Sequence, residues 1–224
     1  MNNADAERSP CVSRCALGAG DFCLGCARAL GEIAQWSAMD GAGRAGAAGR
    51  ARARMDWRRV DGGARAIMAL GPKGEAGLAG GLPWRIPGEL AWFKEATAGM
   101  ALAMGSSSWR GLARALPGRR LAVLSREEPE GLGEVAPGSI WARGLEEVEA
   151  WAFDKGVAMC LAGGRGLWEG GWSGVEMAWI TRVEGPMRAD AFFEPDLSGF
   201  ERVAEGPRGA DGEWTWSAHL WRRR

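Results

Sequence analysis

A single acidic side chain at the start of an expected helix is the first group in the sequence that could take part in chemistry. Glu89 follows Pro87 within the segment LPWRIPGELAWFK, residues 82–94. A carboxylate that faces a pocket can accept two parallel hydrogen bonds from the amidine-like edge of a heterocycle. An ordinary helix start has the same pattern, because proline suits the first helical position and an acid is favourable near the positive end of the helix dipole. Both interpretations stand on this segment alone.

Two further segments place serine and glycine where a phosphate group could bind. The segment GSSSW, residues 105–109, follows an apolar run and opens an expected helix. Serine hydroxyls and free backbone N–H groups at a helix start can hold a phosphate, although N-capping explains the serines equally well. The segment LAGGRGLW, residues 161–168, has the strand, glycine turn and helix layout that lets backbone approach a pyrophosphate. A glycine pair by itself is a weak signal.

Two arginines stand in the turn LPGRR, residues 116–120, which leads into an expected strand. The planar guanidinium group can bind a carboxylate through two parallel hydrogen bonds, so one of these arginines could hold an acidic substrate. The alternative is a type II-like turn whose arginines are simply solvated.

Four of the five cysteines are close together near the N-terminus, in the pattern Cys-x3-Cys-x7-Cys-x2-Cys. These residues are Cys11, Cys15, Cys23 and Cys26. Four thiolates could bind zinc or an iron–sulfur cluster, and the spacing does not choose between the two. A module this small would hardly hold a core without a metal. The alternative is a group of reduced cysteines in a small helical module.

The elements that must position these residues alternate between apolar runs and helical patterns, which predicts an α/β domain with a largely parallel sheet. We expect strands at 64–70, 100–104, 120–125, 157–161 and 176–183, a glycine-rich loop at 71–81, helices at 87–98, 107–115, 144–155 and from 166, and a final antiparallel pair at 200–204 and 214–221. In the helix at 87–98, Leu90, Phe93 and Thr97 are expected on one face.

The chain divides by composition into three parts. Residues 1–40 are the cysteine-rich part, residues 41–54 are a Gly/Ala/Arg stretch that we interpret as a linker, partly helical at most, and residues 55–224 form the larger domain. Lys+Arg and Asp+Glu number 28 each, so the net charge predicts neither a nucleic-acid nor a membrane partner. We expect a cytoplasmic protein, since no apolar run is long enough to span a membrane. We also expect a monomer.

Taken together and in order, these segments resemble dihydrofolate reductase from about residue 64 to the C-terminus. The markers are LPW…P.ELAWFK, MG…W, LPGRR before a strand that ends in Ser125-Arg126, the late glycine pair, and Thr181 followed by DAFFEP at 190–195. The resemblance implies a central, mostly parallel sheet flanked by helices, with an antiparallel C-terminal strand pair. It also implies reduction of 7,8-dihydrofolate to tetrahydrofolate by NADPH, with hydride transfer to C6 and protonation at N5. Residues 9–40 resemble a small bacterial cysteine-rich family of unknown function, for which an iron–sulfur centre has been predicted.

The resemblance also assigns roles around the substrate. It makes Glu89 the acid of the pterin pocket, oriented by Thr181, and it makes Arg119 the arginine that grips the glutamate tail of dihydrofolate. Leu82 and Trp84 match the mobile loop that closes over the nicotinamide, which would exclude water from the hydride step. The apolar walls of the pocket correspond to Ile67, Ala69, Leu90 and Phe93.

For NADPH the resemblance implies a longer set of contacts. These are Ala69, Gly77, Gly105, Ser106, Ser107, Ser108, Ser125, Arg126, Gly163, Gly164, Arg165, Gly166, Leu167 and Trp168. Three places depart from the family pattern: Ser106 and Ser107 stand where a basic residue usually contacts the 2′-phosphate, Ala162 replaces Ile or Val, and Trp168 replaces Tyr. Arg126 could supply the missing charge. These departures keep two alternatives open, a reductase of this fold for another pterin or pyrimidine, and a catalytically weakened regulatory protein.

Overall fold

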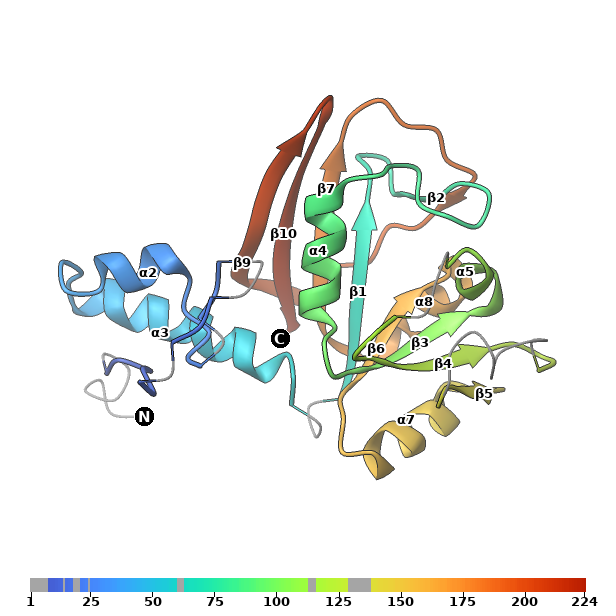
Figure 1. Ribbon diagram of the computed structural model, residues 1–224, viewed down its shortest axis with the longest axis horizontal. Helices are drawn as coiled ribbons and strands as arrows, with labels where there is room; N and C mark the ends of the chain where they lie inside the picture. The colour runs from blue at the N-terminus through green and yellow to red at the C-terminus, as the bar shows by residue number, and fades with distance from the viewer. Residues whose placement is uncertain are drawn as a thin grey trace.

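The computed structural model describes most of the chain as one continuous arrangement of strands and helices (Figure 1). The described residues are 8–13, 15–17, 21–23, 25–59, 63–112, 116–128 and 138–224.

The described strands form an eight-stranded sheet in the order β5-β4-β3-β6-β1-β7-β10-β9. Their bounds are β1 (Ala64–Leu70), β3 (Ala101–Gly105), β4 (Arg120–Leu124), β5 (Ile140–Ala142), β6 (Met159–Gly163), β7 (Val175–Glu184), β9 (Phe200–Asp211) and β10 (Trp214–Arg223). The first six strands of this order are parallel, and β10 pairs antiparallel with both β7 and β9. The predicted fold class is therefore confirmed, including the C-terminal antiparallel pair.

Helices lie on both sides of this sheet and at one end of the molecule (Figure 1). Their bounds are α2 (Leu30–Gln35), α3 (Gly41–Asp56), α4 (Pro87–Ala96), α5 (Ser106–Arg110), α7 (Leu145–Asp154) and α8 (Arg165–Gly171), with a 3-10 turn at Trp172–Gly174. A separate antiparallel pair joins β2 (Glu75–Gly77) to β8 (Ala191–Phe192).

Alternation along β1 separates two hydrophobic cores, because successive strand residues point to opposite faces of a sheet. Ile67 and Ala69 belong to the core that α4 covers with Trp92 and Ala96. Residues 66, 68 and 70 belong to the other core, which α7 and α8 cover. We call the first side the α4 face and the second side the α7 face.

The predicted elements agree with the structure to within a few residues where the apolar pattern is strong. The expected glycine-rich loop at 71–81 contains β2, and the helix expected at 107–115 is α5, which ends at Arg110, while residues 113–115 lie outside the described residues. The sequence analysis did not predict β5, which has only three residues and forms the edge of the sheet.

The Gly/Ala/Arg stretch interpreted as a linker is a continuous helix, α3. Asp40 caps its first turn by accepting a hydrogen bond from Gly43 N at 2.7 Å. Ala47, Ala51 and Ala53 are buried, so the small side chains of α3 allow close packing against the rest of the protein. The glycines lower the intrinsic helix propensity, but tertiary packing of one face outweighs propensity in a helix of this length.

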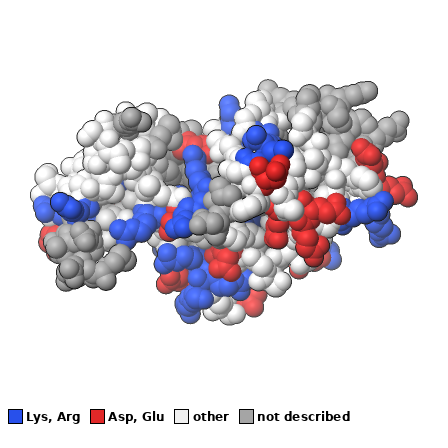
Figure 2. Space-filling model, turned by 90° about the horizontal axis from the view of Figure 1, so that it is seen from below, with Lys and Arg blue, Asp and Glu red and all other residues white. Residues whose placement is uncertain are grey.

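Charged side chains of both signs are interspersed on the face seen from below in Figure 2. This mixture agrees with the equal numbers of acidic and basic residues in the chain. Among the described residues, no helix combines the length and the apolar character needed to cross a bilayer.

Candidate active site

Glu89 is a buried carboxylate in the first turn of α4, on the α4 face of the sheet. Its side chain belongs to a residue that is 4% exposed, and Oε2 has no hydrogen-bond partner among the described residues. Burial raises the pKa of this carboxyl group to about 7. Local sequence explains the position: Pro87 starts the helix, and Gly88 lets the turn approach the indole of Trp216, which a β-carbon would meet at 3.1 Å.

The sheet beneath α4 presents small and β-branched side chains near the carboxyl end of β1. Ile67 and Ala69 are both buried in the α4-face core. Ala69 is paired in register with Thr181 of β7, so these two residues are adjacent on the same face. Thr181 is buried as well. Open α/β sheets bind ligands outside the carboxyl ends of their strands, and Ala69 lies at that end of β1.

A second polar group lies farther along α4. The Arg119 guanidinium carbon is 5.9 Å from the ring centroid of Phe93, and its Nη1 donates to Thr97 Oγ1 at 3.4 Å. Arg119 Nε is buried without a partner in the described structure, and burial lowers the pKa of this side chain. Thr97 follows Glu89 by eight residues, which is about 12 Å of helix rise. The other predicted wall residue, Leu90, is largely exposed, so only Phe93 and Thr97 of the expected face contact this region.

Two residues of the loop before α4, Leu82 and Trp84, were predicted to line the site, and only Trp84 is packed in the core. Trp84 is buried, its indole N–H has no partner among the described groups, and its ring lies 6.3 Å from that of Trp214. Leu82 is exposed. The same loop is tied to the segment after β7, because Ala79 N donates to Asp190 Oδ2 at 2.8 Å. The sequence analysis assigned no role to Asp190 or Trp214, since neither contact joins residues that are near in sequence.

A buried glycine sits where this loop meets β8. A β-carbon on Gly77 would lie 3.3 Å from the Ala191 β-carbon, so the residue leaves little room for a side chain.

The carboxyl ends of β3 and β6 lie side by side and bring the predicted phosphate segments together. A β-carbon on Gly163 would lie 3.3 Å from the Ser108 β-carbon. Gly164 has a φ of +98°, and its β-carbon would lie 3.4 Å from Ser108 Oγ and 3.5 Å from Gly105 N. A side chain is disfavoured here by both backbone conformation and space. The two glycines therefore expose backbone beside the starts of α5 and α8, where free N–H groups favour an anion.

Comparison with known proteins agrees with this arrangement. Residues 64–220 match the family model described as "Dihydrofolate reductase". This chain belongs to the dihydrofolate reductase family.

Among its relatives, dihydrofolate reductase type 3 from Salmonella typhimurium is 30% identical over 149 residues, which is 65% of this chain and 87% of the relative. Dihydrofolate reductase from Haemophilus influenzae is 30% identical over 119 residues, 52% of this chain and 69% of the relative. Among solved structures, dihydrofolate reductase from Enterococcus faecalis complexed with NADP(H) and RAB-propyl is 27% identical, with a TM-score of 0.64 over 72% of this chain and 96% of that chain.

Residues 9–55 match a second family model, described as "Protein of unknown function (DUF1289)". This match extends past the cysteine-rich part predicted at residues 9–40 and includes most of α3. The stretch interpreted as a linker therefore belongs largely to the N-terminal family, which agrees with its packed helical structure.

The reductase-like domain places the other predicted cofactor residues in varied environments. Arg165 forms an ion pair with Glu169 at 2.8 Å. The Ser125 hydroxyl donates to the Glu127 carbonyl oxygen, and Arg126 beside it is exposed. The serines of α5 range from partly buried to exposed, these being Ser106, Ser107 and Ser108.

Trp168, which replaces the tyrosine usual in dihydrofolate reductases, points into the core of the α7 face. Its indole N–H donates to the Leu161 carbonyl oxygen at 3.3 Å, and its ring lies 5.6 Å from that of Phe193. Leu167 packs against the same core. The indole N–H is therefore used within the fold, and the sequence alone did not predict the direction of this side chain.

The N-terminal thiols lie near one another in the described structure. The neighbouring thiols of Cys23 and Cys11 raise the pKa of Cys15. The pKa of Cys23 is lowered to about 7, chiefly because the backbone N–H groups of Cys26 and Gly25 donate to its sulfur.

Two more N–H groups point at sulfur in this module. Ser13 N donates to Cys11 Sγ at 3.4 Å, and Arg28 Nε donates to Cys26 Sγ at 3.5 Å. Nonetheless, no three Cys, His, Asp or Glu side chains of the described chain form a complete set of metal ligands.

Proposed function

We propose that Glu89 is the acid of a dihydrofolate reductase that reduces 7,8-dihydrofolate to tetrahydrofolate with NADPH. The observation that carries this proposal is a buried carboxylate with one unpartnered oxygen and a pKa near neutrality. Such a group can accept hydrogen bonds from the 2-amino group and N3 of a pterin, and it can hold a proton at neutral pH. Membership of the dihydrofolate reductase family supports the same reaction.

NADPH, when bound, supplies the hydride that is transferred to C6 of dihydrofolate. The protein's part is to place the pterin, to exclude water and to promote protonation at N5. Glu89 would anchor the pterin and favour the proton, which reaches N5 through water. Thr181, which lies beside Ala69 on the same face of the sheet, would orient the carboxyl group. Trp84 covers the site from the loop side, and Leu82 extends toward solvent from the same loop. Closure of this loop would keep bulk water from the reacting carbon.

The distance along α4 supports a substrate with an acidic tail. Arg119 is paired with Thr97 at the far end of the helix, about 12 Å of rise from Glu89. A benzoyl group could occupy the interval, lined by Ile67 and Phe93, with Arg119 binding the tail carboxylate. Leu90 would border the open side. This arrangement favours dihydrofolate over a pterin or pyrimidine that lacks a carboxylate.

For NADPH, the proposed site follows the carboxyl ends of β3, β4 and β6. The glycine pair and the start of α5 would hold the pyrophosphate through backbone N–H groups and the Ser108 hydroxyl. Ser106 and Ser107 offer neutral hydroxyls toward the 2′-phosphate, so Arg126 is the proposed positive partner. Ala69 would contact the nicotinamide. The remaining proposed contacts are Gly77, Gly105, Ser125, Gly163, Gly164, Arg165 and Gly166. Leu167 and Trp168 would contribute backbone only, because their side chains pack in the α7-face core.

A steady-state assay tests this function. NADPH oxidation is followed by absorbance with dihydrofolate as substrate, beside a Glu89→Gln variant and an NADH control. We expect turnover with NADPH that collapses in the variant. A folded protein that binds NADPH but does not oxidise it with dihydrofolate would contradict the proposal and favour the regulatory alternative. Turnover only with a pterin lacking the glutamate tail would favour the other-substrate alternative.

We also propose that the N-terminal thiols, Cys11, Cys15, Cys23 and Cys26, bind zinc or an iron–sulfur cluster. The support is that Cys15 lies near Cys11 and Cys23, that Cys23 lies near Cys26, and that N–H groups are directed at three of the four sulfurs, which would stabilise thiolates. Metal analysis and visible absorbance of the purified chain, prepared without oxygen, distinguish zinc from iron–sulfur. Metal-free protein with four titratable thiols and an intact fold would overturn this proposal. Cys160, buried in the reductase-like domain, provides the matched control, since Cys160→Ser should retain any metal.

A further inference from the structure

The segment between the cysteine-rich module and β1 caps the end of the helix that carries Glu89. Trp57 Nε1 donates to the Ala96 carbonyl oxygen at 2.8 Å, and Arg58 Nη2 donates to the Glu95 carbonyl oxygen at 2.9 Å. The last four carbonyl groups of a helix have no partner within the helix, so external donors satisfy them. Two carbonyls of the last turn of α4 thus receive hydrogen bonds from residues that lie outside both matched family models.

This capping segment is itself held in place. Arg65 of β1 is 1% exposed, and its guanidinium group donates to the carbonyl oxygens of Asp56 at 3.0 Å and Trp57 at 3.2 Å. These carbonyls end α3, so a buried arginine of the sheet fixes the helix end from which Trp57 extends. The backbone that carries the indole is therefore bonded to β1, and the indole itself is bonded to α4.

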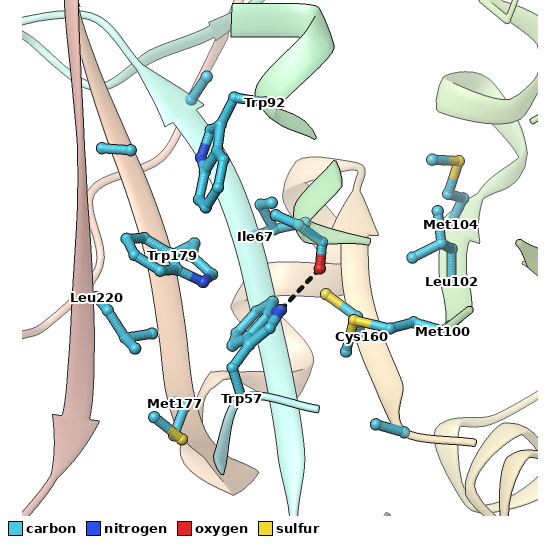
Figure 3. Close-up of a cluster of buried hydrophobic side chains, with 14 of the residues drawn as sticks. Trp57, Ile67, Trp92, Met100, Leu102, Met104, Cys160, Met177, Trp179 and Leu220 are labelled. Atoms are coloured by element: carbon cyan, nitrogen blue, oxygen red, sulfur yellow. Dashed lines mark hydrogen bonds between the residues drawn. The ribbon is translucent and has the colours of Figure 1, made fainter. Parts of the chain in front are cut away.

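Trp57 also begins a row of aromatic rings that continues through Trp179 to Trp92 (Figure 3) and from there reaches the N-terminal module. Its ring lies 6.4 Å from Trp179 at an interplanar angle of 74°, and Trp179 lies 4.8 Å from Trp92 at 84°. Trp92 in turn lies 6.0 Å from Phe22 of the module, and the Arg54 guanidinium covers Phe22 at 4.4 Å. Edge-to-face pairs of this kind add directional contact to simple burial.

The row contacts one flank of α4 while the proposed substrate region contacts the other. At 100° per residue, Trp92 lies about 60° to one side of Glu89 around the helix axis, and Phe93 lies about 40° to the other side. Phe93 is the residue beside Arg119. Packing on the Trp92 flank therefore sets the rotation of α4, and this rotation sets where the Glu89 carboxylate points.

We propose that Trp57 is a positioning residue for dihydrofolate reduction, which acts through Ala96 directly and through Trp92 by way of Trp179 to fix the rotation of α4 and so the place of the Glu89 carboxylate. The proposal rests on the function assigned to Glu89. Side chains reach about 5 Å to 6 Å from a helix axis, so a rotation of about 10° moves a side-chain end by roughly 1 Å. A displacement of that size can reduce turnover by about a hundredfold.

The test compares Trp57→Phe with Trp172→Phe. Each change removes one indole N–H that donates to a carbonyl, from Trp57 to Ala96 at 2.8 Å and from Trp172 to Asp196 at 3.0 Å. Trp172 packs on the α7 face against Phe200, away from α4. We expect Trp57→Phe to lower kcat/KM for dihydrofolate by about threefold to tenfold, as for the loss of one buried hydrogen bond, and Trp172→Phe to leave it within twofold.

The pH profile separates positioning from plain loss of stability. Burial is the cause of the raised pKa of Glu89, and no charged group of the described chain contributes to it. Rotation of α4 would admit water to the carboxylate, so the pKa that governs the profile of Trp57→Phe should fall below that of the unaltered chain, while the Kd for NADPH stays the same. Arg58→Ala, at an exposed contact, should shift the profile in the same direction by less and does not threaten the fold.

An unchanged profile in a folded Trp57→Phe protein would overturn the proposal, as would equal losses of dihydrofolate and NADPH binding. Failure of the underlying function has a different result. In that case the limb of the profile assigned to Glu89 would persist in Glu89→Gln, whatever Trp57 does.

Discussion

Two glutamates are buried among the described residues, and their surroundings are opposite. Glu32, 9% exposed, lies in the N-terminal region and accepts hydrogen bonds from Ala29 N at 2.8 Å, Arg50 Nε at 2.6 Å and Arg54 Nη1 at 2.9 Å. Burial by itself raises the pKa of Glu32, but the hydrogen bonds and charge of Arg54 and its other donors hold the pKa below its usual range. Glu89 has an unpartnered oxygen and a pKa raised to about 7.

We infer that this difference separates a structural acid from one placed to bind a ligand. A buried polar atom without a partner is destabilising, so it persists where a ligand or a reaction needs it. Glu32 satisfies its hydrogen bonds within the fold and joins α2 to α3. The unpartnered Glu89 oxygen is available to accept a hydrogen bond from a ligand. Burial alone would have grouped the two residues together.

The largest expected effect is on turnover at Glu89. Glu89→Gln keeps the size of the side chain but removes the charge and the acid, so we expect kcat/KM for dihydrofolate to fall by about 10²-fold to 10⁴-fold. Circular dichroism and the melting temperature should show a folded protein. Retention of more than a tenth of the activity would mean that the unpartnered oxygen has no catalytic role.

The matching change at Glu32 should affect stability. Glu32→Gln leaves the buried Arg54 without its charged partner, which costs about 3 kcal/mol when one member of a buried pair is removed. For a chain of this size the melting temperature should fall by about 10 °C, as scanning calorimetry would measure. A melting temperature within two degrees of the unaltered chain would show that the Glu32 cluster is not structural.

The two glutamates should also respond to pH with opposite signs. The folded-state pKa of Glu89, about 7, lies above its ordinary value of 4.5, so its stabilising proton is bound below 4.5 and lost as pH rises through 7. Between pH 5 and pH 8 the unaltered chain loses stability as the buried carboxyl group ionises, whereas Glu89→Gln has no such group. The unfolding free energy of the variant should therefore rise by up to about 3 kcal/mol relative to that of the unaltered chain, since a pKa difference of one between the folded and unfolded states is about 1.4 kcal/mol. The folded-state pKa of Glu32 is lowered, so its contribution is present above 4.5 and is lost as pH falls through the folded value. Urea titrations at several pH values would measure the stability of each variant relative to the unaltered chain. If this difference changes with pH in the same direction for the Glu89 and Glu32 variants, the assignment is wrong.

The smallest of these effects extends the comparison to arginines. Arg65 donates to several carbonyl groups, while Arg119 has a buried Nε without a partner among the described residues. We expect Arg119→Gln to raise KM for dihydrofolate by about tenfold with kcat nearly unchanged, because one charge-assisted contact to the tail is lost. A pterin without the glutamate tail should show no change in KM. An equal rise for both substrates would assign Arg119 to the fold.

The parts of the fold that sequence predicted well are those with long apolar runs between turns. Strand β1 was predicted with its observed bounds, and the helix from Pro87 ends two residues earlier than expected. The Glu89 position could be identified because the residue types around it form a long motif. Its burial and its free oxygen could not, since they depend on packing between segments far apart in the sequence, such as the approach of Trp216 of β10 to the neighbouring Gly88.

The failures have a shared physical cause. Helix α3 has a poor intrinsic pattern and is stabilised by contacts with distant residues, among them a hydrogen bond from Arg54 to the Glu205 carbonyl oxygen at 3.2 Å. The direction of Trp168 likewise depends on Phe193, which lies in a segment far along the chain. Local periodicity carries no information on such pairings, and tertiary context overrides propensity where it is weak.

The helix α3 has a consequence for the cooperativity of unfolding. A helix rich in glycine is marginal by itself, and α3 ends on hydrogen bonds to β1 while its neighbour Trp57 bonds to α4. Melting of the N-terminal region would therefore remove the caps of α4, and melting of the sheet would release the end of α3. Although two family models divide the sequence, calorimetry should record one heat-absorption peak in which both parts unfold together.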